Sequence, residues 1–360
     1  MKHRLFRFLV EEKGFRTLAM EADGAASCAV DTYVRTGRGD PALAIYDLRF
    51  WTWNTEEVLD MVRWMRDFNR TAPSGSQLRF IGLDMQNPTT ATSRVAEFLH
   101  GIDPSLEREA REAGACLGPL DSVQEFYANY RERPPEDQAA CSSRLAALHA
   151  KLVAEKASWS PRDSAGYDCA VWSAHLLTQL EKLLRVANAR DGLMADNAAA
   201  LVADKREPGG VMIWAHNAHV AKASGAMGRM IERRLGPKYT GVGQAYGTGL
   251  FHARSRLSEK KTGPVTGFPT APFRTDSYER AFERVGLPLF AIDLRLAEDA
   301  GATWLAGPHP LHEVGGSYYE GKGDSTSYSL AEAFDLMLYH QRSTPTRMLP
   351  RPPNRVPIPQ

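Results

Sequence analysis

Two residues of this chain, His216 and Glu21, combine a side chain suited to proton transfer with a position directly after an apolar run. His216 follows the run 211–215, and Glu21 follows the run 15–20. Strands covered by helices on both faces consist of continuous apolar runs, and ligands bind beyond the carboxyl ends of such strands. There an imidazole can act as a base, an acid or a polariser of a carbonyl, and a carboxylate can fix its tautomer or activate water. The sequence therefore predicts an acid–base site centred on His216.

A third apolar run, 78–83, ends at Asp84. If the three runs lie side by side in one sheet, Glu21, Asp84 and His216 share one rim of that sheet. An aspartate after a strand is also commonly the cap of the next helix, and this structural role explains Asp84 as well as substrate binding does. For His216, the structural alternative is a buried, hydrogen-bonded histidine.

The pair His216 and His219 raises the alternative of a metal centre, because residues three apart on a helix share a face. A third ligand would have to come from Glu21, Asp84 or a distant histidine such as His312. No HExxH motif and no dense cluster of cysteines and histidines supports such a centre. Metal is therefore the second hypothesis, and we predict neither a metal nor a cofactor.

Two other kinds of chemistry lack the sequence context that they need. The chain has no GxSxG motif, which disfavours a serine nucleophile. The glycines within 241–249 lie between strand-like runs and do not open a helix, so they do not indicate a dinucleotide site. We expect these glycines to shape a hairpin or to line a pocket.

Further residues could contact a substrate. Trp51, within the aromatic segment 50–53, could form the apolar wall of a site for a bulky neutral ligand, with Arg49 as an anchor. Core packing explains this segment equally well. The other candidates for substrate contact are Asn217, His219, Asp84 and, if it reaches the site, Arg190.

The composition is that of a globular protein. Hydrophobic residues make up 43% of the 360 residues, which suffices for one large core or two modest ones. The 44 basic and 43 acidic residues leave no overall field that would attract nucleic acid or an anionic membrane, so we expect a small-molecule partner. No apolar run approaches the roughly 20 residues needed to cross a bilayer. The four cysteines show no CxxC spacing and no secretory leader precedes them, so we expect free thiols and a cytoplasmic protein.

The interleaving of helix-like and strand-like segments predicts an α/β fold with a mixed central sheet flanked by helices. Residues 1–89 and 208–342 are expected to form the α/β core. The segment 90–207 has alanine-rich amphipathic stretches without a convincing strand, which predicts a helical insertion or subdomain. Residues 343–360 are rich in proline and arginine and are expected to form a flexible tail. Strands of the core are expected at 15–21, 78–83, 211–215, 239–246, 249–254, 287–293 and 334–339.

Taken in order, several segments resemble the erythromycin esterase family, whose members open macrolide lactones by hydrolysis and whose uncharacterised relatives are often labelled succinoglycan biosynthesis proteins. The resemblance spans nearly the whole chain. Its motifs are 5–15 (LFRFLVEEKGF), Glu21, 50–57 (FWTWNTEE), 82–86 (GLDMQ), Arg190-Asp191 with 194–197 (MADN), 214–219 (WAHNAH) and Phe334-Asp335.

The resemblance implies metal-independent hydrolysis of an ester or lactone, with His216 as an active-site histidine, Glu21 as a pocket carboxylate and Lys2 as a basic pocket residue. It also implies another histidine, thought to activate the hydrolytic water, in a turn ahead of Met1 that this sequence does not contain. We therefore expect either a start internal to a longer gene or a shortened relative. The alternatives are a metal-dependent hydrolase that uses His216 and His219, and a relative that binds a small molecule without turnover.

Overall fold

The computed structural model describes residues 1–73, 75–120, 123–204, 209–258, 261–320, 325–353 and 355. The chain divides into two compact units: Met1–Trp214 with Met348–Gln360 form unit 1, and Ala215–Arg347 form unit 2. The predicted division into a core, a helical insertion and a tail remains a prediction. The α/β class with mixed sheets and flanking helices is confirmed.

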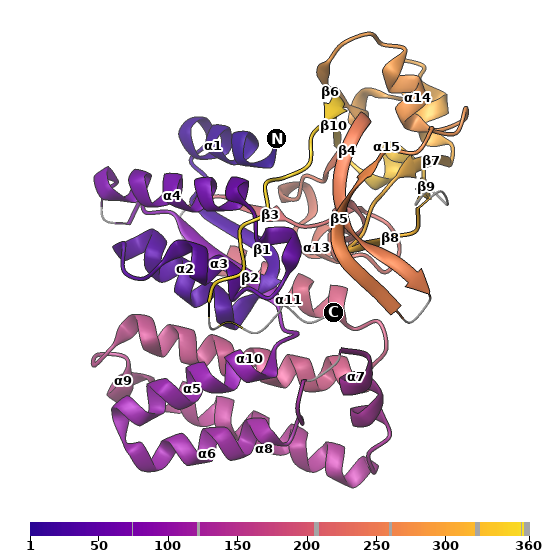
Figure 1. Ribbon diagram of the computed structural model, residues 1–360. Coiled ribbons are helices and arrows are strands. Elements are labelled where there is room, and N and C mark those ends of the chain that lie inside the picture. Colours follow the sequence, from indigo (N-terminus) through magenta and orange to yellow (C-terminus); the bar gives the residue numbers. More distant parts are fainter. Residues whose placement is uncertain are drawn as a thin grey trace. The chain divides into compact units, whose positions relative to one another are not determined.

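Unit 1 combines a small sheet with many helices (Figure 1). Its elements are α1 (Lys2–Lys13), β1 (Thr17–Asp23), α2 (Gly24–Thr36), α3 (Pro41–Tyr46), η1 (Trp51–Trp53), α4 (Glu56–Thr71), β2 (Arg79–Asp84), α5 (Pro88–Ile102), α6 (Pro104–Ala115), α7 (Val123–Arg131), α8 (Pro135–Ala154), α9 (Lys156–Trp159), α10 (Ser164–Arg185), α11 (Arg190–Ala203) and β3 (Val211–Trp214).

The sheet of unit 1 is parallel and has the strand order β2-β1-β3. Met20 of β1 pairs with Gly82 of β2 and with Trp214 of β3. The three apolar runs therefore lie side by side, as predicted, and the carboxyl ends of β1 and β2 lie at one edge. A Cβ at Gly82 would stand 2.6 Å from the carbonyl oxygens of Ala22 and Asp23, so the irregular end of β1 requires glycine there.

An apolar core surrounds this sheet. Leu18 and Met20 of β1 are fully buried together with Phe6 of α1 and Met61 and Met65 of α4. Burying each of these side chains stabilises the fold by roughly 1.5–3 kcal/mol. The apolar stripe of α4 is thus core, and it packs against the sheet that carries Glu21 and Asp84.

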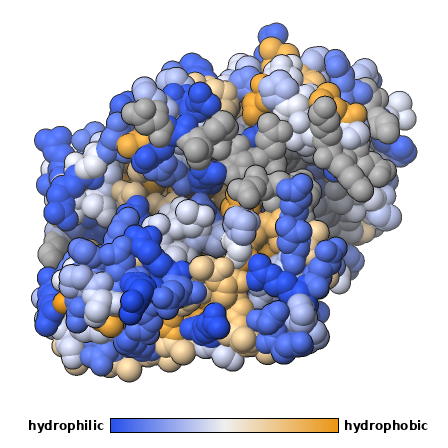
Figure 2. All heavy atoms as spheres, turned by 60° about the horizontal axis from the view of Figure 1, so that its bottom comes forward, coloured by the Kyte–Doolittle hydropathy of each residue, from blue (hydrophilic) through white to orange (hydrophobic). Residues whose placement is uncertain are grey.

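Helices α5 to α10 form a layer next to α2 (Figure 1). The face turned forward in Figure 2 is mostly hydrophilic, with smaller apolar areas between the polar residues. This is the distribution expected for helices that bury one stripe and expose the opposite side. None of the helices in the described residues is long and apolar enough to span a membrane.

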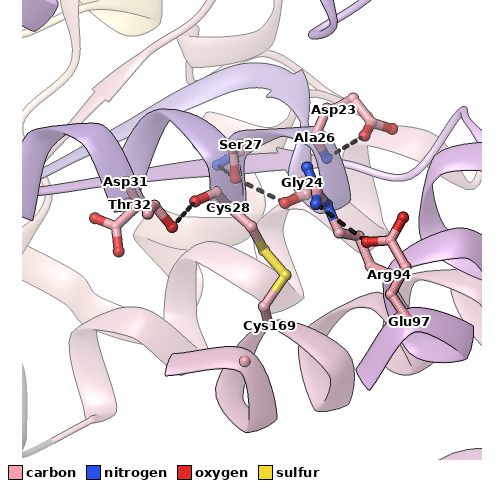
Figure 3. Close-up of a disulfide and its surroundings, with 12 residues drawn as sticks. Asp23, Gly24, Ala26, Ser27, Cys28, Asp31, Thr32, Arg94, Glu97 and Cys169 are labelled. Carbon is pink, nitrogen blue, oxygen red and sulfur yellow. Dashed lines mark hydrogen bonds and ion pairs between the residues drawn. A yellow bond between two sulfur atoms is a disulfide. The ribbon is translucent and has the colours of Figure 1, made fainter. Parts of the chain in front are cut away.

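One disulfide joins this layer to α2 and a second lies within the layer, so the prediction of free thiols is wrong. Cys28 of α2 is bonded to Cys169 of α10, as Figure 3 shows, with 6.0 Å between their Cα atoms. The second bond joins Cys116 and Cys141, whose Cα atoms lie 5.5 Å apart. The partners are 141 and 25 positions apart in sequence, so only the packing of the helices brings them together. The predicted cytoplasmic location loses the argument on which it was based.

Removing the Cys28–Cys169 disulfide by a double serine substitution should lower the free energy of unfolding by about 2–4 kcal/mol, because the bond closes a long loop in the unfolded chain. The same double substitution at Cys116 and Cys141 should lower the free energy of unfolding by less, because that disulfide closes a shorter loop. Urea unfolding without reductant measures both losses. Four titratable thiols in unfolded, unreduced wild-type protein would contradict the pairing.

Unit 2 is built mainly from strands (Figure 1). Its elements are α12 (Asn217–Val220), α13 (Met227–Leu235), η2 (Gly236–Lys238), β4 (Val242–Ser258), β5 (Lys261–Pro269), α14 (Tyr278–Glu283), β6 (Leu289–Asp293), η3 (Leu294–Leu296), η4 (Thr303–Ala306), β7 (His309–His312), β8 (Ser317–Tyr318), β9 (Ser325–Tyr328), α15 (Leu330–Ala333) and β10 (Leu336–Ser343).

The larger sheet of unit 2 is mixed and has the order β5-β4-β10-β6, with β8 beside β4. The strands predicted at 239–246 and 249–254 are one strand, β4, which pairs with β10 over its first part and with β5 over its second. Gly249, with φ at 147°, lies where β4 passes between these partners. A Cβ there would stand 2.1 Å from the carbonyl oxygen of Ser343. Gly249 therefore allows β4 and β10 to approach closely, and it does not form a turn between two strands.

Within the predicted tail, Met348 and Leu349 belong to unit 1 and pair with the segment before α4. Met348 pairs with Thr55, and the backbone N–H of Leu349 donates to the carbonyl of Asn54 at 2.9 Å. The Asn54 side chain donates in return to the carbonyl of Leu349 at 3.0 Å. Residues 354 and 356–360 of the predicted tail lie outside the described residues.

Candidate active site

At the edge of the unit 1 sheet, Arg190 joins Glu21, which lies two residues before the end of β1, to Asp84, the last residue of β2. Its Nη2 donates to Glu21 Oε1 at 2.9 Å and to Asp84 Oδ2 at 2.5 Å, and its Nε donates to the same Asp84 oxygen at 3.1 Å. A guanidinium can hold two acids in this way because its donors form a rigid planar fork. Glu21 and Asp84 thus share one rim, as predicted, and Arg190 reaches them from the start of α11.

Burial separates the roles of the two acids. The Asp84 side chain is fully buried, whereas that of Glu21 is 13% exposed. Asp84 also accepts hydrogen bonds from the backbone of Met85 at 2.9 Å and from Gln86 Nε2 at 2.8 Å. Burial lowers the pKa of Arg190, but the charges and hydrogen bonds of Asp84 and Glu21 outweigh it and raise that pKa overall. These contacts favour Asp84 as the anchor of Arg190, and its predicted contact with substrate remains a prediction.

A third acid, Asp23, lies beside this pair. It ends β1 opposite Asp84, and its Oδ1 caps α2 by accepting from the backbone N–H of Ala26 at 2.7 Å (Figure 3). Burial, together with the nearby charge of Asp84, raises the pKa of Asp23 from 3.8 to about 8 against the opposing effect of its backbone hydrogen bonds. The rim therefore combines an ion-paired acid with one that retains its proton to a higher pH.

Replacing Asp23 with asparagine should flatten the dependence of stability on pH. The pKa of Asp23 is raised in the folded state, so protonated Asp23 contributes to the free energy of unfolding. This contribution is fully present below the unfolded-state pKa of 3.8 and is lost as pH rises through about 8. Asparagine keeps an acceptor for Ala26 without a charge. The variant should therefore become more stable relative to wild type as pH rises from about 5 to about 9, which urea unfolding at a series of pH values measures. Asp40→Asn, at the exposed cap of α3, is the matched control. An unchanged pH slope in Asp23→Asn would refute the shift.

Two tryptophans connect this rim to Lys2. Trp53 Nε1 donates to the backbone carbonyl of Glu21 at 2.7 Å, and the Trp53 ring meets Trp214 edge-on, with centroids 5.7 Å apart. Lys2 Nζ lies 5.3 Å from the centre of the Trp214 ring. Burial lowers the pKa of Lys2 to about 8, although the charge of Glu21 opposes this change. The predicted pocket residues Lys2 and Glu21 thus belong to one cluster.

The predicted anchor Arg49 lies near the same edge in a conformation rare for its residue type. Its φ is 64°, in the left-handed region that favours glycine. Burial lowers the pKa of Arg49, and nearby Tyr46, Asp47 and Asp23 oppose that change. Trp51 is half-buried and begins η1, the short helix that also carries Trp53.

His216 belongs to unit 2, and both of its ring nitrogens form hydrogen bonds there. The backbone N–H of Ala218 donates to Nδ1 at 3.2 Å, which makes His216 the cap of α12. Nε2 lies 3.1 Å from the carbonyl oxygen of Val314. A carbonyl oxygen can only accept, so Nε2 must carry the proton, and Nδ1 must be unprotonated to accept from Ala218. The arrangement therefore selects the neutral Nε2–H tautomer.

The neighbours of His216 differ in their contacts. Asn217 binds the backbone of Gln244 in β4 twice, donating to its carbonyl at 2.7 Å and accepting from its N–H at 3.1 Å. His219 is half-buried on α12. In the part of the chain that the structure describes, no group of three or more His, Cys, Asp or Glu side chains is arranged to hold a metal ion. The convergence of His216 and Glu21 on one cavity remains a prediction.

The family model and a curated relative point to the same family. The sequence model of the erythromycin esterase family matches residues 10–343. Erythromycin esterase type II of Escherichia coli is 21% identical over 272 residues, which are 68% of this chain and 64% of that protein. The chain thus spans slightly less than two thirds of the length of this curated relative.

Solved structures show the same fold at low identity. A crystal structure of a Bacillus cereus protein has a TM-score of 0.79 at 23% identity and covers 97% of this chain and 86% of its own. A succinoglycan biosynthesis protein has a TM-score of 0.78 at 23% identity, with coverages of 97% and 85%. A variant of erythromycin esterase EreC in its open conformation has a TM-score of 0.64 at 18% identity, with coverages of 93% and 85%. Because the family match extends over nearly the whole sequence, the chain belongs to the erythromycin esterase family.

Proposed function

We propose that this protein hydrolyses a carboxylic ester or lactone of a bulky neutral small molecule, such as a macrolide, by direct attack of water. Membership of the erythromycin esterase family supports hydrolase chemistry at the level of the class. The proposal assigns His216 to the carbonyl oxygen and Glu21 to the attacking water. It does not need a covalent intermediate or a metal ion.

The hydrogen bonding of His216 is the observation that carries the proposal. Its Nε2–H already donates to a carbonyl oxygen, that of Val314, at 3.1 Å. A substrate carbonyl in place of Val314 would receive the same donor, which polarises the C=O bond and stabilises the negative oxygen of the tetrahedral intermediate. A base role at Nδ1 would require breaking the bond to Ala218. The geometry therefore favours His216 as a hydrogen-bond donor over a general base.

Glu21 is the acid that we assign to water. It is partly exposed, unlike Asp84, and Arg190 holds its carboxylate at 2.9 Å. In the proposed step, water attacks the acyl carbon while Glu21 takes its proton, and the departing alkoxide takes that proton as the intermediate collapses.

The aromatic pair Trp53 and Trp214 supports a bulky, neutral substrate. Edge-on tryptophans offer a large apolar wall with few polar groups. Lys2 over Trp214 adds a donor for a substrate oxygen, consistent with a partner that is a small molecule and not a nucleic acid or membrane. The two disulfides favour an oxidising compartment over the cytoplasm.

The test is to incubate the purified chain with p-nitrophenyl esters, simple lactones and macrolides and to follow product masses. We expect a product heavier by one water from at least one lactone, with the rate unchanged by a chelator. Activity lost to the chelator and restored by a metal would favour the alternative that uses His216 and His219. Thermal stabilisation by a macrolide without any product would favour the relative that binds without turnover.

A further inference from the structure

We propose that Glu279 and Glu313 are positioning residues that orient His216 by holding the segment 312–314. This inference rests on the proposed function, because it assigns a purpose to the hydrogen bond between His216 and Val314. All of the residues involved belong to unit 2. The segment begins with His312, the last residue of β7, and its own last residue, Val314, presents the carbonyl that accepts from His216 Nε2.

Glu279 holds the first residue of this segment. Its Oε1 accepts the backbone N–H of His312 at 2.7 Å. Glu279 is fully buried on α14, and the ring of His312 packs against Phe273 and Tyr246, with centroids 5.6 and 5.8 Å away. A buried acceptor on a helix thus fixes the backbone two residues before Val314.

Glu313, the next residue of the segment, is held through its own side chain. Its Oε2 accepts from Tyr328 Oη at 3.0 Å, and Tyr328 ends β9, the partner of β7. Tyr278, the neighbour of Glu279 on α14, donates to the carbonyl of Tyr328 at 2.9 Å. The contacts therefore close a ring from α14 through β9 and back to the segment, immediately before Val314.

The cluster of Glu279, His312 and Glu313 lowers the stability of the fold, which a purely structural element would not be expected to do. Four buried polar atoms in it have no hydrogen-bond partner among the described residues, namely Glu279 Oε2, Glu313 Oε1 and both ring nitrogens of His312. Burying carboxyl groups with so few partners costs free energy that apolar side chains would not. Such violations are expected at functional sites, and this one lies beside the acceptor of His216.

The acids therefore act through the Val314 carbonyl. Held at a fixed place, that oxygen keeps the proton of His216 on Nε2 before substrate arrives, so the imidazole does not have to change tautomer during the reaction. Burial raises the pKa of Glu279, which favours its neutral form. Glutamine at this position is therefore a close substitute that keeps the acceptor oxygen.

The test compares matched substitutions. Glu279→Leu and Glu313→Leu remove the acceptors, whereas Glu279→Gln and Glu313→Gln keep them. We expect kcat with a p-nitrophenyl ester to fall roughly tenfold to a hundredfold in the leucine variants, with KM changed less than about threefold. The glutamine variants should stay within about twofold of wild type, since the oxygens remain.

Ring ¹⁵N NMR of His216 separates positioning from a structural role and does not depend on activity. The leucine variants should show both neutral tautomers of His216, and wild type and the glutamine variants only Nε2–H. If the leucine variants misfold, Tyr328→Phe, which removes only the donor to Glu313, should give the same mixture. An unchanged tautomer in a folded leucine variant or in Tyr328→Phe would overturn the inference, whereas the expected tautomers without hydrolysis by wild type would refute only the proposed function.

Discussion

The His216→Asn variant is expected to lose about 10²–10³-fold in kcat for ester hydrolysis, because it lacks the donor that stabilises the negative oxygen of the tetrahedral intermediate. Asparagine is a good helix cap, so it can still accept the backbone N–H of Ala218 and keep α12 in place. It is too short to replace Nε2 at the Val314 carbonyl. The loss should therefore come from chemistry and not from unfolding. Steady-state kinetics with the best ester, together with urea unfolding, measures both quantities.

His100→Asn is the matched control for this substitution. His100 is an exposed histidine of α5 that pairs with Glu107 at 2.7 Å, and it has no place in the proposed chemistry. Its kcat should equal that of wild type. Hydrolysis by His216→Asn within about threefold of wild type would exclude His216 from the mechanism.

The Arg190→Met variant is expected to lose about 3–5 kcal/mol of unfolding free energy, because it leaves the buried carboxylate of Asp84 without its cation. The charges of Asp84 and Glu21 then repel each other at the edge of the sheet. Adding Asp84→Asn to this variant should recover much of the loss, since it removes the unpaired charge. Arg190→Lys should give a smaller loss, because lysine keeps the charge but not the planar fork. Urea unfolding of the four proteins measures these differences.

Arg70→Ala serves as the control for a surface ion pair. Arg70 and Asp67 are both about two thirds exposed, at 67% and 68%, and the loss should stay below about 1 kcal/mol. If Arg190→Met were no less stable than Arg70→Ala, the claim that Arg190 stabilises the fold by pairing with Glu21 and Asp84 would be wrong.

The sequence predicts the sheet of unit 1 well because its strands are continuous apolar runs. Three such runs, each followed by a polar residue, were enough to place Glu21 and Asp84 on one edge. Arg190 could not be assigned to them with the same certainty, since its partners lie 169 and 106 positions earlier in the chain. Contacts over such separations depend on the packing of α11 against the sheet, which periodicity does not describe.

Other features were missed for related reasons. The cysteine pairs depend on helix packing and not on local spacing, so the sequence favoured free thiols. The glycines within 241–249 suggested a break between two strands, whereas Gly249 allows one long strand to pass close to β10. The acceptor of His216 is a backbone carbonyl 98 positions away, and no side-chain motif marks it.

The most direct test of the account is the tautomer of His216 in the free wild-type protein, read from its ring ¹⁵N shifts after assignment with His216→Asn. The account predicts that the neutral ring carries its proton on Nε2 and leaves Nδ1 unprotonated. A neutral ring with its proton on Nδ1 would contradict the role of His216 as an Nε2–H donor to a carbonyl oxygen.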